Sequence, residues 1–140
     1  MDQLTRVADT GELMALERQI ELIARSSDNE HHYGLILIDL VGLRKINAVF
    51  DRTTGDKVLV ELAGRLRSLC PKACVARVEA DKFAVLVDGL SQDATSAEGR
   101  RLKDEMNSAS WRIDGKMVAV KVRVTCVSGP SPFPGETNLL

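Results

Sequence analysis

The residues with the clearest chemical potential stand in a predicted turn. The stretch "RVEADKFAVLV", residues 77–87, predicts two short strands joined by a tight connection that holds Glu79, Ala80, Asp81 and Lys82. Hairpin turns usually take Gly, Asn or Asp, because those residues tolerate a positive φ. Carboxylates are ligands for hard cations such as Mg²⁺, and a neighbouring ammonium opposes that use. Turn geometry alone therefore does not explain an acid–Ala–acid–base run.

Metal ligation is the chemistry that the cysteines and histidines could offer, but their spacing does not favour it. Cys70 and Cys74 are four positions apart and Cys126 is the only other cysteine, so a second zinc-binding pair is missing. His31 and His32 are adjacent, and consecutive residues do not share a face of a helix or strand. We predict buried, apolar-like cysteines and solvated loop histidines.

A second group of charges lies at Arg100, Arg101 and Lys103, in a polar segment that permits a helix. We predict a solvated helix face there, and a role in contacting phosphate stays open. Trp111 stands at the start of a predicted strand, where core or edge packing is expected.

Composition limits the class of protein. The chain has 140 residues, of which 44% are apolar and 28% charged, with a formal net charge of −1. These values are typical of one soluble domain with one core. They argue against nucleic-acid binding, which usually shows a basic excess.

The expected location is the cytoplasm. No apolar run approaches the roughly 18 residues that a membrane helix needs, and "MDQLTRVADTGEL" lacks the apolar stretch of a signal peptide. An odd number of cysteines without a secretory signal suggests reduced thiols.

The elements that must position these residues follow from periodicity. Apolar spacing predicts helices and continuous or alternating apolar runs predict strands. The predicted elements are a helix over Thr10 to Ala24, a doubly buried strand over Tyr33 to Leu40, a weak helix around Leu43 to Phe50, a helix over Asp56 to Cys70, and strands over 73–78 and 83–87. We expect Thr54 to cap the fourth of these and Pro71 to end it.

The C-terminal half continues the pattern. Residues 93–108 predict a helix, and residues 111–127 predict a hairpin that turns at Asp114–Gly115, with its second arm alternating from Val118 to Val124. Residues 129–140 form a Pro- and Gly-rich tail without periodicity. This order of elements predicts an α+β or α/β layer fold around a central sheet.

Residues 35–59, "LILIDLVGLRKINAVFDRTTGDKVL", carry a set of residues at fixed offsets. Asp39, Ile46, Asn47, Gly55, Asp56 and Leu59 match the first motif of the GGDEF domains, the family that includes diguanylate cyclases, and Leu43–Arg44 replace its Phe-Lys pair. The departures are Val41 and Ala48 for two Asp residues and Asp51–Arg52 for Gly-His.

The opening stretch aligns with the family signature, Arg-x-Gly-Gly-Asp-Glu-Phe followed by an apolar strand. Here it occurs as Arg77 to Phe83, "RVEADKF", followed by "AVLV". Residues 2–13, "DQLTRVADTGEL", are similar to the family's N-terminal Leu-Thr-Gly-Leu-x-Asn-Arg motif. The chain thus resembles a degenerate GGDEF domain over residues 1–128.

The resemblance implies a ferredoxin-like, nucleotide-cyclase palm fold, with a central, mostly antiparallel sheet flanked by helices. Active members join two GTP molecules into cyclic di-GMP across a head-to-head pair. The family's last helix carries basic residues that hold phosphates, and residues 129–140 are expected to stop before it, as in a fragment of a longer protein.

The resemblance also implies roles for single residues. Asp39 and Asp81 would hold Mg²⁺, which is expected only together with GTP. Asn47 and Asp56 would bind guanine. An inhibitory product site, Arg-x-x-Asp, is not expected, because its window holds residues 70–73, "CPKA".

The changed signature argues against catalysis. Glu79 and Ala80 replace glycines that let the backbone approach a nucleotide, and Lys82 replaces an acid near the metal. We therefore expect a catalytically inactive domain that regulates, senses GTP or dimerises, in a protein that can also carry a sensor or an EAL-type phosphodiesterase domain. Two alternatives stay open: an active cyclase with atypical metal ligands, and a protein-interaction domain without a nucleotide.

Overall fold

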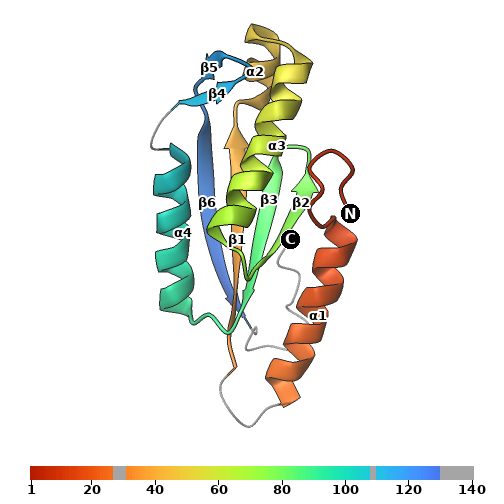
Figure 1. The fold of residues 1–140 in the computed structure, drawn as a ribbon. Coiled ribbons are helices and arrows are strands. Elements are labelled where there is room, and N and C mark those ends of the chain that lie inside the picture. The colour runs from red at the N-terminus through yellow and green to blue at the C-terminus, as the bar shows by residue number, and fades with distance from the viewer. Residues whose placement is uncertain (27–30, 108–109, 130–140) are drawn as a thin grey trace.

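A computed structural model describes residues 1–26, 31–107 and 110–129 (Figure 1). Its elements are α1 (Thr10–Ser26), β1 (Tyr33–Val41), α2 (Leu43–Val49), α3 (Arg52–Leu69), β2 (Cys74–Glu79), β3 (Lys82–Asp88), α4 (Gln92–Asn107), β4 (Trp111–Ile113), β5 (Lys116–Val118) and β6 (Lys121–Gly129). The tail predicted over 129–140 lies outside the described residues from position 130 onward.

The centre of the fold is a sheet with strand order β2-β3-β1-β6, in which all three pairings are antiparallel. Helices α3 and α4 cover one face and α1 packs on the other, against β2 and β3 (Figure 1). The predicted class, an antiparallel sheet flanked by helices, is therefore confirmed.

Strand β1 is buried on both faces, as its continuous apolar sequence predicts. Ile36 and Ile38 point into the core under α3 and α4, whereas Tyr33 and Leu35 join the smaller cluster under α1. Side chains alternate between the faces of a strand, so a central strand needs apolar residues at successive positions. Position 39 interrupts this run with a carboxylate on the α1 face.

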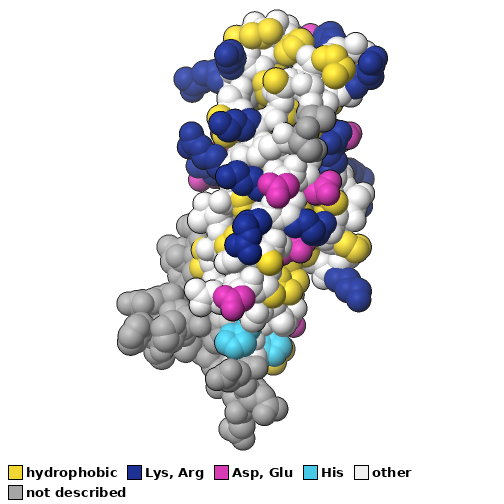
Figure 2. All heavy atoms as spheres, turned by 90° about the vertical axis from the view of Figure 1, so that its left-hand side faces the viewer, with side chains coloured by type: hydrophobic (Ala, Val, Ile, Leu, Met, Phe, Trp, Pro, Cys, Tyr) yellow, Lys and Arg dark blue, Asp and Glu magenta, His cyan; other side chains and the backbone are white. Residues whose placement is uncertain are grey.

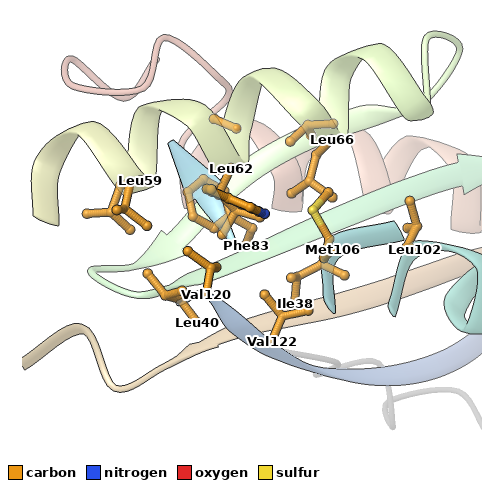
Figure 3. Close-up of a cluster of buried hydrophobic side chains, with 14 of the residues drawn as sticks. Ile38, Leu40, Leu59, Leu62, Leu66, Phe83, Leu102, Met106, Val120 and Val122 are labelled. Atoms are coloured by element: carbon orange, nitrogen blue, oxygen red, sulfur yellow. The ribbon is translucent and has the colours of Figure 1, made fainter. Parts of the chain in front are cut away.

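The larger core joins α3, α4 and the sheet (Figure 3). Phe83, Leu62 and Met106 lie at its centre and are fully buried. Trp111 is buried as well, with the Arg65 guanidinium 4.1 Å from the centroid of its ring, a favourable cation–π arrangement. The prediction of core packing for Trp111 is confirmed.

The prediction of buried thiols is confirmed for Cys70 and only in part for Cys74 and Cys126. All three cysteines are free; Cys70 is buried, and Cys74 and Cys126 are half-buried. Burial is the main cause that raises the pKa of Cys70 to about 11, so this thiol stays protonated at neutral pH.

The predicted start of α3 was wrong. The helix begins at Arg52 rather than Asp56, and its N-cap is Asp51 rather than Thr54. The Asp51 carboxylate accepts the Thr54 backbone N–H at 2.7 Å, and the hydrogen bonds from Thr54 lower the pKa of Asp51. Asp is among the preferred N-cap residues because it satisfies an unpaired N–H of the first turn. Thr54 is buried inside that turn instead.

The predicted C-terminal hairpin was wrong in extent. Its turn at Asp114 and Gly115 is confirmed, since both residues have a positive φ, of 50° and 79°. The arm that follows divides, however, into β5, which pairs with β4 in a separate two-stranded sheet, and β6, which pairs with β1. The alternation of apolar and polar residues continues from β5 into β6, because Val118, Val120 and Val122 all enter the same core.

Two glycines in helices predict opposite effects of the same substitution. A Cβ on Gly99, in α4, would lie 2.3 Å from the Cys126 Sγ on β6, whereas a Cβ on Gly64, in α3, would meet nothing within 4 Å. We expect Gly99→Ala to lower the free energy of unfolding by about 1–3 kcal/mol through overpacking. We expect Gly64→Ala to raise it by about 0.5–1 kcal/mol, because Ala is the better helix former.

Urea unfolding followed by circular dichroism measures both changes under the same conditions. A stabilising effect of Gly99→Ala would contradict the close approach of α4 to β6.

Candidate functional site

The turn between β2 and β3 consists of Ala80 and Asp81 and is held by one arginine. The Arg77 side chain donates to the Ala80 carbonyl from Nε at 3.1 Å and from Nη2 at 2.8 Å. Its Nη1 also donates to both Asp2 carboxylate oxygens at 3.4 Å. A bulge between Arg77 and Glu79 shifts the pairing just before the turn. The leading Arg of the signature therefore fixes the shape of the turn.

The backbone of this turn does not need glycine. Among the described residues, positive φ values occur at Arg6, Asp114 and Gly42, Gly89 and Gly115, and at no position of the turn. Glu79 and Ala80 thus stand in conformations that L-residues adopt freely. The turn is well formed as a hairpin, and its side chains occupy space beside the backbone that glycines would leave open.

The turn meets β1 next to Asp39. The Leu40 backbone N–H donates to the Asp81 carbonyl at 2.8 Å, and Asp39 pairs in register with Lys82 on β3. On its other side Asp39 pairs with Arg123 on β6. Residues directly opposite in antiparallel strands project from the same face, with Cβ atoms about 4.5–5.5 Å apart. Asp39 therefore lies between two cations.

Lys82 is held by its acidic neighbours. Its Nζ is 3.1 Å from the Glu79 Oε2. The hydrogen bond and charge of Glu79 raise the pKa of Lys82, and the charges of Asp39 and Asp81 raise it further. Lys82 is thus an ammonium ion at neutral pH.

These charges face a pocket of about 620 Å³ between α1 and the sheet. Thr10 and Met14 of α1 line one side, and Leu37, Asp39 and Arg123 are among the residues that line the sheet side. The smaller cluster under α1 does not fill this part of the face, because α1 packs over β2 and β3 rather than over β6.

The donor set does not fit a protein-bound divalent ion. Within residues 1–26, 31–107 and 110–129, no group of three or more His, Cys, Asp or Glu side chains is arranged to hold a metal. The predicted ligands Asp39 and Asp81 do come from adjoining strand ends, but Lys82 and Arg123 flank Asp39. Like charge repels an incoming cation, so this cluster disfavours Mg²⁺ at Asp39.

The predicted guanine-binding residues come together where α2 meets α3. The Asn47 Oδ1 is buried and has no hydrogen-bond partner in the part of the chain that the structure describes. It lies against Gly55, where an added Cβ would be 1.8 Å from it. Asp56 follows Gly55 in the first turns of α3 and is half-buried. A buried acceptor without a partner costs free energy.

Other candidate residues have structural roles. His31 and His32 lie in a loop, where His32 is exposed and His31 is partly exposed, with its Nε2 2.6 Å from the Asp88 Oδ1. Arg101 pairs with Glu98 and donates to the Leu69 carbonyl at 2.8 Å, which ties α4 to the end of α3.

The face that carries α4 shows Lys and Arg side chains interspersed with Asp and Glu (Figure 2). Arg100 and Lys103 are exposed on α4, as a solvated helix face requires. Arg123 is the site residue that sequence reasoning missed. Its signal was the alternation that places it on the polar face of β6, but no pattern indicated that β6 would pair with β1.

Comparisons with known proteins agree with this fold. The family model described as "Diguanylate cyclase, GGDEF domain" matches residues 1–137. The GGDEF domain of FimX from Pseudomonas aeruginosa superposes with a TM-score of 0.84 at 20% identity, over 91% of this chain and 78% of that one. The GGDEF domain of DgcB from Caulobacter crescentus, solved in complex with c-di-GMP, superposes with a TM-score of 0.82 at 18% identity, over 98% of this chain and 80% of that one. At these identities the likeness shows the fold.

Curated relatives are longer. Uncharacterized membrane proteins of Staphylococcus aureus, among them that of strain USA300, are 23% identical over 126 residues, which is 89% of this chain and 35% of theirs. The chain thus spans about a third of the length of these curated relatives. No helix among the described residues is long and apolar enough to span a bilayer. On the strength of the family model, the chain belongs to the GGDEF domains of the diguanylate cyclase family, the family of cyclic di-GMP signalling.

Proposed function

We propose that this chain is a catalytically inactive GGDEF domain that senses guanine nucleotide and regulates or pairs with other domains of a cyclic di-GMP signalling protein. The observation that carries the proposal is the register that places Asp39 between Lys82 and Arg123. The strands pair regularly around this position, whereas the charges needed for catalysis are changed.

Loss of catalysis follows from the chemistry of phosphoryl transfer. The reaction depends on positioning and on cations that neutralise the charge developing on the phosphoryl oxygens. Lys82 is paired with Glu79 and stands opposite Asp39, so the acids at this end of the sheet already have a counterion. Any Mg²⁺ at this position would enter with GTP, bound to its phosphates rather than held by the protein.

Nucleotide sensing is supported by a different part of the structure, where α2 meets α3. Guanine presents N–H donors that the Asn47 Oδ1 and the Asp56 carboxylate could accept. Asn47 is already oriented by its contact with Gly55, so little conformational entropy remains to be lost on binding. The base side is thus suited to guanine while the catalytic side is not.

The proposed setting is the cytoplasm, where GTP is available, with a sensor or EAL-type domain in the same protein or a second copy of the chain as partner. The diguanylate cyclase SiaD, which superposes with a TM-score of 0.82 at 20% identity, was solved in complex with its activator SiaC. That example supports a protein partner for this fold, and a nucleotide-dependent contact would give the present domain a regulatory output.

Catalytic inactivity predicts that incubation with GTP and Mg²⁺ or Mn²⁺ yields no cyclic di-GMP. Chromatographic separation of the products measures this, with an active GGDEF cyclase as the positive control. Cyclic di-GMP that disappears in Asp81→Ala would instead establish an active cyclase with atypical ligands.

Nucleotide sensing predicts that Asn47→Ala weakens GTP binding about tenfold, the equivalent of one hydrogen bond to a buried acceptor. The substitution removes an unpaired buried oxygen and inserts a better helix former, so the unfolding free energy without ligand should not fall. Calorimetric titration and urea unfolding measure the two quantities.

Asp56→Asn is a second test of this site and should also weaken GTP binding. The matched control is Asp104→Asn on the exposed face of α4, which should leave GTP binding unchanged. If the unsubstituted protein bound neither GTP nor GDP, a protein-interaction domain without a nucleotide would be the better description.

A further inference from the structure

Position 82 is surrounded by acids from three sides. The Lys82 Nζ contacts the Glu79 Oε2 at 3.1 Å, Asp81 precedes it in the chain, and Asp39 is its cross-strand partner on β1. These are the carboxylates nearest the end of the sheet at which the family resemblance places a metal. The ammonium therefore pairs with Glu79 and lies within the electrostatic reach of Asp39 and Asp81, two acids that the resemblance assigns to the metal.

The backbone at Lys82 is held in place by the hydrogen bonds of the turn, although the Lys82 side chain is partly exposed. Arg77 holds the Ala80 carbonyl from two nitrogen atoms, and the Leu40 N–H holds the Asp81 carbonyl at 2.8 Å. The turn is thus tied to β2 and to β1 at successive residues, immediately before Lys82. The Lys82 side chain leaves the same face of the sheet as Asp39 because the two pair directly.

The charges of the cluster nearly balance. Asp39, Glu79 and Asp81 carry three negative charges, and Lys82 and Arg123 carry two positive ones, which leaves one formal negative charge. With Glu in place of Lys82, four acids would face one cation, which leaves three formal negative charges. Mg²⁺ is bound through hard, anionic oxygen ligands, so the second arrangement suits it and the first does not.

We infer that the Lys82 ammonium is a built-in cation that takes the place of a bound divalent ion, so that guanine nucleotide binds to this chain without Mg²⁺. The first part of this inference, that Lys82 replaces a bound metal ion, concerns the protein alone. The second part, that guanine nucleotide binds without Mg²⁺, rests on the proposed nucleotide site at Asn47 and Asp56. The nucleotide would then bind through its base at Asn47 and Asp56, without a metal bridge between its phosphates and the acids around Lys82.

Titration with Mn²⁺ alone tests the first part, with calorimetry or electron paramagnetic resonance as the readout and the full chain as the sample. We expect no saturable site in the unsubstituted protein. We expect Lys82→Glu to create a saturable Mn²⁺ site, and the added change Asp39→Asn to abolish it. Lys103→Glu makes the same change of charge on the exposed face of α4 and should have no effect.

Circular dichroism verifies that each variant is folded, and Lys82→Gln, which removes the ammonium without adding an acid, provides a milder second test. We expect Lys82→Gln to bind Mn²⁺ more tightly than the unsubstituted protein does. A saturable Mn²⁺ site in the unsubstituted protein that is lost in Asp39→Asn would overturn the inference, as would variants at position 82 that bind Mn²⁺ no better.

Titration with GTP in Mg²⁺ and in excess EDTA tests the second part. We expect dissociation constants that agree within about twofold in the unsubstituted protein, and a dependence on Mg²⁺ of at least about tenfold in Lys82→Glu. A tenfold loss of affinity in EDTA for the unsubstituted protein would refute metal independence. If GTP bound under neither condition, the proposed nucleotide function would fail, and the Mn²⁺ titration would still decide the role of Lys82.

Discussion

The antiparallel register between β1 and β3 is the constraint on which the rest of the structure depends. It places Ile38 opposite Phe83 in the larger core and, one residue further, Asp39 opposite Lys82 on the other face. A slip of one residue would exchange the faces and bury the charges. The hydrogen bond from the Leu40 N–H to the Asp81 carbonyl extends this pairing as far as the turn. Fold and site chemistry are therefore fixed by the same pairing.

This alternation explains how the fold persists although the signature has changed. Phe83 faces the core and is fully buried, whereas its neighbour Lys82 projects from the opposite face. A change at position 82 alters the charge at the site without altering the packing of the sheet. The same separation holds on β6, where Val122 is buried and Arg123 is exposed. The residues that form the core and those that set the charge of the site thus alternate along one strand.

Much of the fold was predictable because its signals are local. The continuous apolar run of β1 and the helical spacing in α3 identified those elements, and family offsets brought Asn47 and Asp56 to one place. The errors arose where several local solutions compete: Asp51 and Thr54 can both cap a helix, and the alternation of valines passes unbroken through the division between β5 and β6. Arg123 was missed because strand pairing is a long-range property. The unpaired Asn47 oxygen likewise depends on the contact between α2 and Gly55, which no spacing in the sequence specifies.

The clamp made by Arg77 links two segments that are far apart in the sequence. Asp2, near the start of the chain, and Ala80, in the turn, are both bound by one guanidinium group, and Ala8 forms an isolated parallel bridge to Ala76 beside it. The first residues are therefore mechanically connected to the hairpin at the site rather than separate from it. One guanidinium group thus holds the first residues of the chain and the turn together, so the loss of Arg77 would release both segments at once.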